Sequence, residues 1–267
     1  MTGELRTGLY VPGDRPDRFA KAETSGADLV VYDLEDAVPP TGKTAARRAV
    51  VERLLSAEPG AVAAQVRVVA GDVDDLRAVA LLPAHVGVRL PKVEGSADLD
   101  RAAALAPGRP LTALIESARG VLHAAEIAAH PAVTQVALGE SDLRSDVGGG
   151  DPVLDHARLV VLFAARAAGL PAPMGSVYPA IRDLDGLRAD TLRLAGLGLF
   201  GRMAVHPTQL APIAAVFRPD ATEIAWAQEV LAALRDGGVT TLASGEMVDP
   251  AMRGRAERIL RAADARP

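Results

Sequence analysis

The sequence predicts an α/β protein folded as a (β/α)₈ (TIM) barrel with a short C-terminal helical extension, and three observations support this. About eight short apolar runs, typical of buried strands, alternate with segments that carry helix signals. Ala, Val and Leu are abundant while aromatic residues make up only 3%, as suits a barrel interior filled by aliphatic side chains. An open doubly wound sheet is the alternative, but Pro12-Gly13-Asp14-Arg15 after the first strand is not its glycine-rich phosphate loop.

The predicted elements follow one another at intervals that leave room for one helix after each strand. Strands are expected at residues 9–12, 28–32, 63–69, 86–90, 111–115, 133–138, 171–177 and 202–205, and the run at 171–177 is the weakest. Helices are expected at residues 16–25, 43–56, 72–82, 98–105, 121–129, 154–168, 184–197 and 207–216. Pro16 suits the first turn of a helix, and Gly26 ends that helix. The segment after Asp142, through Gly148-Gly149-Gly150, is expected to be an exposed loop.

A boundary near Phe217-Arg218-Pro219 divides the chain into a catalytic barrel, residues 1–217, and an extension, residues 218–267. Helices at 222–236 and 252–263 are expected in the extension, on either side of a loop. Gly237-Gly238 and Gly245 give that loop a hinge on each side, as lids need. The extension is too short for a core of its own, so we expect it to pack on the barrel or on another subunit.

Composition excludes several classes of protein. The net charge of −5 argues against a dedicated nucleic-acid binder, although local Arg clusters still allow an anionic small substrate. The absence of cysteine removes disulfides, thiolate zinc sites and thiol nucleophiles. The first residues, Met1 to Arg6, have no apolar targeting core, and no run is long enough to span a membrane. A cytoplasmic protein is therefore expected.

Two successive strands end in carboxylates. Glu116 follows the apolar run 111–115, and Asp142 follows the run 133–138. An acid at the end of a buried strand is costly unless it is solvated, paired or bound to a metal. Two carboxylates on one rim suit Mg²⁺ or Mn²⁺, which take oxygen ligands and keep waters. The alternative is that each acid caps the helix that follows, but the recurrence at two strand ends favours a metal.

Other charged residues also fall at predicted strand ends, where barrel enzymes place their catalytic groups. These are Asp14, Arg15, Asp33, Glu35, Asp36, Arg67, Lys92 and His206. Arg67 interrupts an apolar strand, and it is either a structural partner of the acids at 33–36 or a clamp for a substrate carboxylate or enolate. For Lys43 and Arg47, one helical turn apart, a solvated face is favoured. His206 is interpreted as a hydrogen-bonded structural residue.

Seven segments in order give the chain a resemblance to a known family. They are Pro12–Phe19, Asp33–Val38 with Lys43 and Arg47, Val66–Val68, Leu90–Lys92, Ala113–Gly120, His206–Gln209 and Met247–Pro250. Over residues 9–260 the chain resembles the citrate lyase beta-subunit-like branch of the HpcH/HpaI aldolase family. It departs from the family pattern at Val69, where Asn is usual, at Gly139-Glu140-Ser141-Asp142, where Gly-Ala-Glu-Asp is usual, and at Gly175, where Asp is usual.

The resemblance implies a Mg²⁺-dependent C–C lyase on a (β/α)₈ barrel, with Glu116 and Asp142 as metal ligands and Glu140 as the less favoured choice. It implies that Arg67 holds the substrate carboxylate and the developing oxyanion, and that Glu35 and Asp36 order metal-bound water. It also implies a trimer, in which Asp249 lies on a lid over a neighbouring subunit's site; the alternative is that Asp249 caps the last helix. Arg15, Glu35 and Lys92 are expected among the substrate-binding residues.

The implied reaction cleaves a carboxylate-bearing 3-hydroxyacyl thioester of malyl, citramalyl or citryl type into an oxo acid and an acyl thioester. The partner is acyl-coenzyme A (acyl-CoA) or an acyl-carrier thioester, with hydrolysis as a further step. Two alternatives are a subunit of a larger lyase complex that acts on a carrier protein, and a family member that binds a metabolite without turnover.

Overall fold

The computed structural model describes residues 5–57, 62–235 and 237–264, which form two compact units. The larger unit, Leu5–Val216, is an α/β structure on a seven-stranded parallel sheet with the order β6-β5-β4-β3-β2-β1-β7. The strands are β1 Thr7–Pro12, β2 Leu29–Asp33, β3 Ala63–Arg67, β4 Gly87–Leu90, β5 Leu111–Ile115, β6 Val133–Leu138 and β7 Arg202–Ala204. The prediction of an α/β protein with a parallel sheet is confirmed.

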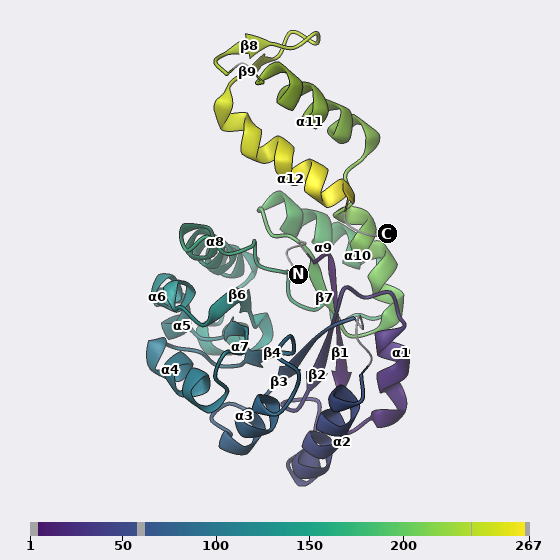
Figure 1. Ribbon diagram of the computed structural model, residues 1–267, viewed down its shortest axis with the longest axis vertical. Coiled ribbons are helices and arrows are strands. Elements are labelled where there is room, and N and C mark those ends of the chain that lie inside the picture. Colours follow the sequence, from purple (N-terminus) through teal and green to yellow (C-terminus); the bar gives the residue numbers. More distant parts are fainter. Residues whose placement is uncertain (1–4, 58–61, 236, 265–267) are drawn as a thin grey trace. The chain divides into compact units, whose positions relative to one another are not determined.

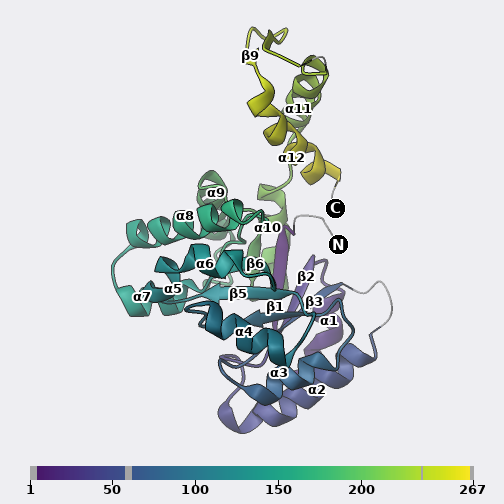
Figure 2. The same cartoon turned by 60° about the vertical axis from the view of Figure 1, so that its left-hand side comes forward.

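The sheet is curled, and most helices of this unit lie around its outer face (Figures 1 and 2). The helices are α1 Phe19–Glu23, α2 Lys43–Leu55, α3 Val73–Ala80, α4 Ser96–Leu105, α5 Ala118–Leu122, α6 Ala124–Ala129, α7 Glu140–Val147, α8 Asp151–Ala167, α9 Leu184–Gly196 and α10 Leu210–Val216. Every residue of β2, β4 and β5 is buried, as a sheet covered on both faces requires.

The predicted strand at 171–177 is wrong as a ladder strand. Within the described residues, only Gly175 of this segment pairs with the sheet, through an isolated parallel bridge to Arg202. Pro171 and Pro173 have no N–H to donate to a ladder, which explains the interruption. On the other side, the Ser176 hydroxyl donates to the Leu138 carbonyl of β6 at 2.6 Å. The segment therefore bridges β6 and β7 by single contacts rather than by a strand.

The segment after Asp142 is also corrected. It forms α7 instead of a loop, and Asp142 lies in the first turn of this helix. Gly148 ends the helix with φ 65°, a conformation that glycine adopts without a Cβ clash. The predicted loop is thus limited to the triglycine, Gly148–Gly150, between α7 and α8.

Lys43 and Arg47 do not form a solvated face. The Lys43 ammonium donates to the Leu34 carbonyl at 2.7 Å and also to that of Glu35, so it fixes the loop that follows β2. The Arg47 guanidinium bonds to the Asp75 carboxylate at 2.5 Å, which ties α2 to α3. The spacing of two residues along one helix does not predict these partners, because they lie on other elements.

The smaller unit holds α11 Ala221–Ala233, the strands β8 Thr240–Thr241 and β9 Met247–Val248, and α12 Arg253–Asp264. Asp220 and Glu223 form a reciprocal capping box at the start of α11. The expected end of this helix at Asp236 lies outside the described residues. A buried apolar cluster joins its elements, formed by Ala227, Val230, Leu234, Leu242, Val248 and Ala256. The extension therefore has a small core, contrary to the expectation from its length.

None of the helices in the described ranges combines the length and the apolar character that a membrane crossing needs.

Candidate active site

A cavity of about 740 Å³ opens at the carboxyl ends of the strands. Its wall includes the charged residues Asp33, Asp36, Arg67, Arg89, Glu116, Glu140, Asp142 and Arg144. Tyr10, Met174, Ser176 and Met203 add aromatic, thioether and hydroxyl groups. Pockets of about 300–1,000 Å³ with a few convergent polar groups are typical of small-molecule sites.

Glu116 is held in the cavity wall by backbone contacts from two directions. It directly follows β5, is only 5% exposed, and its Oε2 accepts the Lys92 N–H at 2.9 Å. Lys92 has φ 55°, the one positive φ of a non-glycine residue in the described chain, and this costs about 1–3 kcal/mol. The other carboxylate oxygen of Glu116, Oε1, lies so close to Gly139 that a Cβ added to this glycine would be 2.1 Å from it. Burial raises the pKa of Glu116, and the neighbouring Asp142 carboxylate raises it further.

The capping interpretation fails for both acids. Ser117, not Glu116, caps α5, by accepting the Gly120 N–H at 3.1 Å. No side chain caps α7, whose first turn contains Asp142. Neither carboxylate is therefore used by a helix end.

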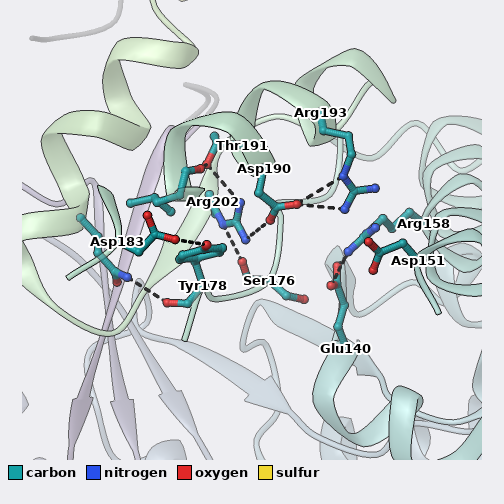
Figure 3. A network of polar contacts seen from close by, with 12 residues as sticks. Glu140, Asp151, Arg158, Ser176, Tyr178, Asp183, Asp190, Thr191, Arg193 and Arg202 are labelled. Atoms are coloured by element: carbon teal, nitrogen blue, oxygen red, sulfur yellow. Dashed lines mark hydrogen bonds and ion pairs between the residues drawn. The ribbon is translucent and has the colours of Figure 1, made fainter. Parts of the chain in front are cut away.

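Glu140, the other acid at the start of α7, is occupied by an arginine. Arg158 of α8, 4% exposed, makes two parallel bonds to the Glu140 carboxylate, at 2.8 and 2.5 Å (Figure 3). Such bidentate pairs are the strong ones. Asp142 also lies in the cavity wall, and it forms no ion pair among the described residues. The contacts therefore favour Asp142 over Glu140 as a metal ligand.

The residues present suit a hydrated divalent cation. Within residues 5–57, 62–235 and 237–264, no three carboxylate or imidazole side chains come close enough to hold a metal on their own. Mg²⁺ does not need them, since it usually binds one or two carboxylates and keeps its other positions for water and substrate oxygens. Glu116 and Asp142, both in the cavity wall, are the candidates for this pair.

Arg67 lies at the end of β3 and is paired with the acids that follow β2. Its guanidinium donates to both oxygens of Asp33, at 2.7 and 2.6 Å, and to Asp36 at 3.1 Å. Cross-strand register explains the pairing, because Asp33 and Arg67 are direct partners in β2 and β3. The structural ion pair of the two sequence interpretations is thus present, and the guanidinium also lines the cavity.

Glu35 is buried beside this pair. Its Oε2 lies 3.0 Å from Arg67 Nη1 but forms no hydrogen bond, and Oε1 lies 3.6 Å from the Lys92 ammonium. Burial raises the pKa of Glu35 to about 7, against the opposing effect of Arg67. A carboxyl with this pKa can hold or release a proton near neutral pH.

Four predicted site residues are not part of the cavity wall: Arg15, Glu35, Lys92 and Asp249. Arg15 follows β1 and pairs with Asp17, at 2.9 and 2.7 Å. Asp249 belongs to the smaller unit, where it caps a 3₁₀ turn, Pro250–Met252, by accepting the Ala251 N–H at 2.9 Å. His206 caps the turn Pro207–Gln209, in agreement with its structural interpretation.

Sequence reasoning missed Arg89 and Tyr10. Arg89 interrupts the apolar run of β4 just as Arg67 interrupts that of β3, so the same signal was available. It is 1% exposed, and both guanidiniums lie over the Tyr10 ring, at 5.2 Å for Arg67 and 5.7 Å for Arg89.

Comparison with known proteins shows the family of this chain. The HpcH/HpaI aldolase/citrate lyase family matches residues 6–207. The chain belongs to this family. The (3S)-malyl-CoA thioesterase of Cereibacter sphaeroides is 39% identical over 257 residues, covering 92% of this chain and 90% of that protein. A citrate lyase subunit beta-like protein of Mycobacterium tuberculosis is 37% identical over 264 residues, covering 96% and 94%.

Solved structures of relatives carry ligands. The structure of CitE from Mycobacterium tuberculosis in complex with magnesium, acetoacetate and coenzyme A matches with a TM-score of 0.82 and 36% identity, over 97% of this chain and 98% of that chain. A citrate lyase beta subunit from M. tuberculosis, complexed with oxaloacetate and magnesium, matches with a TM-score of 0.70 and 34% identity over 81% and 98%. This HpcH/HpaI family member is thus a citrate lyase beta-like enzyme whose homologues bind Mg²⁺, coenzyme A and oxo acids.

Proposed function

We propose that this protein is a Mg²⁺-dependent C–C lyase that cleaves a carboxylate-bearing 3-hydroxyacyl-CoA into an oxo acid and an acyl-CoA. The observation that supports it most is that Glu116 and Asp142 lie in the wall of one cavity that arginines also line. We further propose that residues 173–177 take the place of the eighth strand, so that the curled sheet acts as a (β/α)₈ barrel.

Glu116 and Asp142 are the proposed ligands of the metal, with Mn²⁺ as a substitute. When bound, the ion supplies Lewis-acid polarisation of the substrate's oxygens. The chain's own part is to fix the two carboxylates. Lys92 N–H and the open face of Gly139 orient Glu116, and the Arg158–Glu140 pair holds the first turn of α7 and so orients Asp142.

Arg67 is the proposed clamp for the substrate carboxylate and for the negative charge that develops on the thioester half. Its bidentate bond to Asp33 fixes the direction of the guanidinium before substrate arrives, which lowers the cost of orienting it during the reaction. Asp36, exposed at the cavity and bonded to Arg67, is the proposed base for the substrate hydroxyl, acting with ordered water. Glu35 and Lys92 complete the substrate-binding side, and Arg15 contributes from the rim.

The extension is the proposed lid. In this scheme the protein is a homo-oligomer, a trimer, and Asp249 of one subunit donates the proton to the α-carbon of the thioester enolate in its neighbour's site. The buried cluster of the smaller unit gives such a lid a stable shape of its own.

A thioester screen tests the reaction. Purified protein with Mg²⁺ is incubated with malyl-, citramalyl- and citryl-CoA, and the glyoxylate, pyruvate or oxaloacetate that each would release is measured. Parallel reactions with carrier-protein thioesters test the alternative of a subunit that needs a carrier. No oxo acid from any thioester would refute the lyase.

Hydrolysis is the second candidate, and the similarity to the (3S)-malyl-CoA thioesterase of C. sphaeroides favours it. The same reactions separate the two, because hydrolysis releases free coenzyme A and an intact hydroxy acid, whereas the lyase releases an acyl-CoA and an oxo acid.

The metal assignment has its own test. Glu116→Ala and Asp142→Ala should each abolish Mg²⁺ binding and turnover in a folded protein, whereas Glu140→Ala should be milder. Calorimetric Mg²⁺ titration and circular dichroism measure both effects. The reverse order of Asp142 and Glu140 would move the ligand to Glu140.

A further inference from the structure

Arg89 is a buried cation with no acid beside it. The residue is 1% exposed and forms no ion pair with any side chain in the described ranges. Its Nε donates to Gln65 Oε1 at 3.0 Å, while Nη1 and Nη2 have only long contacts, 3.4 Å to the Tyr10 hydroxyl and 3.8 Å to the Met203 sulfur. A guanidinium has five N–H donors, so most of the donor capacity of Arg89 is poorly used.

Two other deeply buried arginines of this unit are neutralised. Arg158, 4% exposed, pairs with Glu140, and Arg202, 3% exposed, pairs with Asp190 at 2.7 Å (Figure 3). A buried charge without a partner is strongly disfavoured, so proteins retain one where a ligand supplies the counter-charge. Arg89 differs from these arginines in having only neutral partners.

The acids of the cavity are already committed. Asp33 is taken by Arg67, and Glu140 by Arg158. In the proposed function Glu116 and Asp142 face the metal. The Arg89 guanidinium lies over the same Tyr10 ring as Arg67 and belongs to the cavity wall, so its charge faces the space that the substrate fills.

We propose that Arg89 is a specificity-determining residue, which binds a second carboxylate on the oxo-acid half of the substrate. This inference rests on the proposed function. We assign the acid half of the substrate to the part of the cavity beside Arg89, because this guanidinium belongs to the cavity wall and is only 1% exposed. Arg89 thus selects a dicarboxylic oxo acid over a monocarboxylic one.

Binding of two acids that differ by one carboxylate tests this directly. Oxaloacetate and pyruvate are titrated calorimetrically into the Mg²⁺-loaded protein. The wild type should bind oxaloacetate at least about tenfold more tightly, as one additional charged hydrogen-bonded pair implies. Arg89→Met should remove this preference and leave the affinity for pyruvate unchanged. Arg89→Lys, which keeps the charge but loses the planar fork, should retain part of it.

Thr112→Val is the matched control. Thr112 is the register partner of Arg89 in β5, is fully buried, and bonds to Gln65 at 2.9 Å, so the change disturbs the same interior layer without removing a charge. It should keep the preference for the dicarboxylate.

Thermal unfolding separates a ligand-binding role from a structural one. Without ligand, Arg89→Met should unfold at a higher temperature than the wild type, because an apolar side chain replaces an uncompensated buried charge. A lower melting temperature together with an unchanged acid preference would show that Arg89 is structural and overturn the proposal. Failure of the proposed function looks different: neither acid would bind in a Mg²⁺-dependent way, and no thioester would be cleaved.

Discussion

Replacing Gly139 by alanine should disable the metal site without unfolding the protein. The backbone at Gly139, φ −96° and ψ 86°, is open to alanine, so no backbone strain arises. The added Cβ would instead lie 2.1 Å from Glu116 Oε1 and 2.4 Å from its Cγ. Nonbonded carbon atoms rest about 3.5 Å apart, so the carboxylate must withdraw by roughly 1 Å.

The expected loss follows from that displacement. Disturbing the groups that orient a metal ligand costs about 10–100-fold in metal affinity, and a misplacement of about 1 Å at a reacting centre can cost about 10²-fold in rate. Overpacking of this kind costs about 1–3 kcal/mol of folding free energy, which a protein of ordinary stability tolerates. Gly139→Ala should therefore lower Mg²⁺ affinity at least tenfold while its circular dichroism spectrum stays that of the wild type.

Gly196→Ala is the control, since this helical glycine has nothing within 4 Å of an added Cβ. It should bind Mg²⁺ as the wild type does. Calorimetric titration of Mg²⁺, or of Mn²⁺ followed by electron paramagnetic resonance, measures the affinity of each variant. Wild-type affinity in folded Gly139→Ala would refute the assignment of Glu116 as a ligand.

Three further predictions use other parts of the site. Arg67→Lys should lose most activity, because a point charge cannot bond to Asp33 and a substrate carboxylate in fixed directions; unchanged kinetics with a lower melting temperature would mark a purely structural ion pair. Burial raises the pKa of Glu35 from 4.5, its value in the unfolded chain, to about 7, so the free energy of unfolding should fall as the pH rises through this range. Glu35→Gln should flatten this fall in denaturant titrations of the metal-free protein. Identical pH profiles of the variant and the wild type would contradict the burial argument. Asp249→Ala and Glu116→Ala, each inactive, should regain activity when mixed under subunit exchange if sites are shared, and exchange confirmed by mass without activity would exclude this.

The alternation of elements was predictable because it depends on local pattern. Six of the predicted strands, in the segments 9–138, appear in the sheet, since a run of apolar residues between turn signals carries enough information by itself. The segment at 171–177 failed because its two prolines remove donors, which periodicity does not count. The helix at 140–147 was missed because the triglycine after it suggested a loop, although Glu140 and Asp142 suit a helical first turn.

Pairing of side chains was far less predictable. The two sequence interpretations of Arg67 were left open, and both remain compatible with its contacts, because the Asp33 pair leaves the guanidinium in the cavity wall. The family resemblance favoured Asp142 over Glu140 as a metal ligand, but local pattern did not give the physical reason, since the difference between them is made by Arg158, sixteen or more positions away on another helix. Such partners are brought together by helix packing, on which local pattern is silent.

Arg67 and Arg89 show most clearly where the information lies. Each interrupts an apolar strand, so local sequence does not distinguish them, although Arg89 is fully buried and Arg67 only partly. Their environments differ through register: the neighbour of Arg67 across β2 is Asp33, whereas Arg89 has Arg67 on one side and Thr112 on the other. Asp33 therefore neutralises the charge of Arg67 before any ligand binds, whereas the partners of Arg89 are all neutral. The sheet gives Arg89 no acidic partner, and the residue lies in the wall of the proposed active site. Because an unpaired buried charge destabilises the fold, the negative charge of a substrate explains this arginine better than a structural role does.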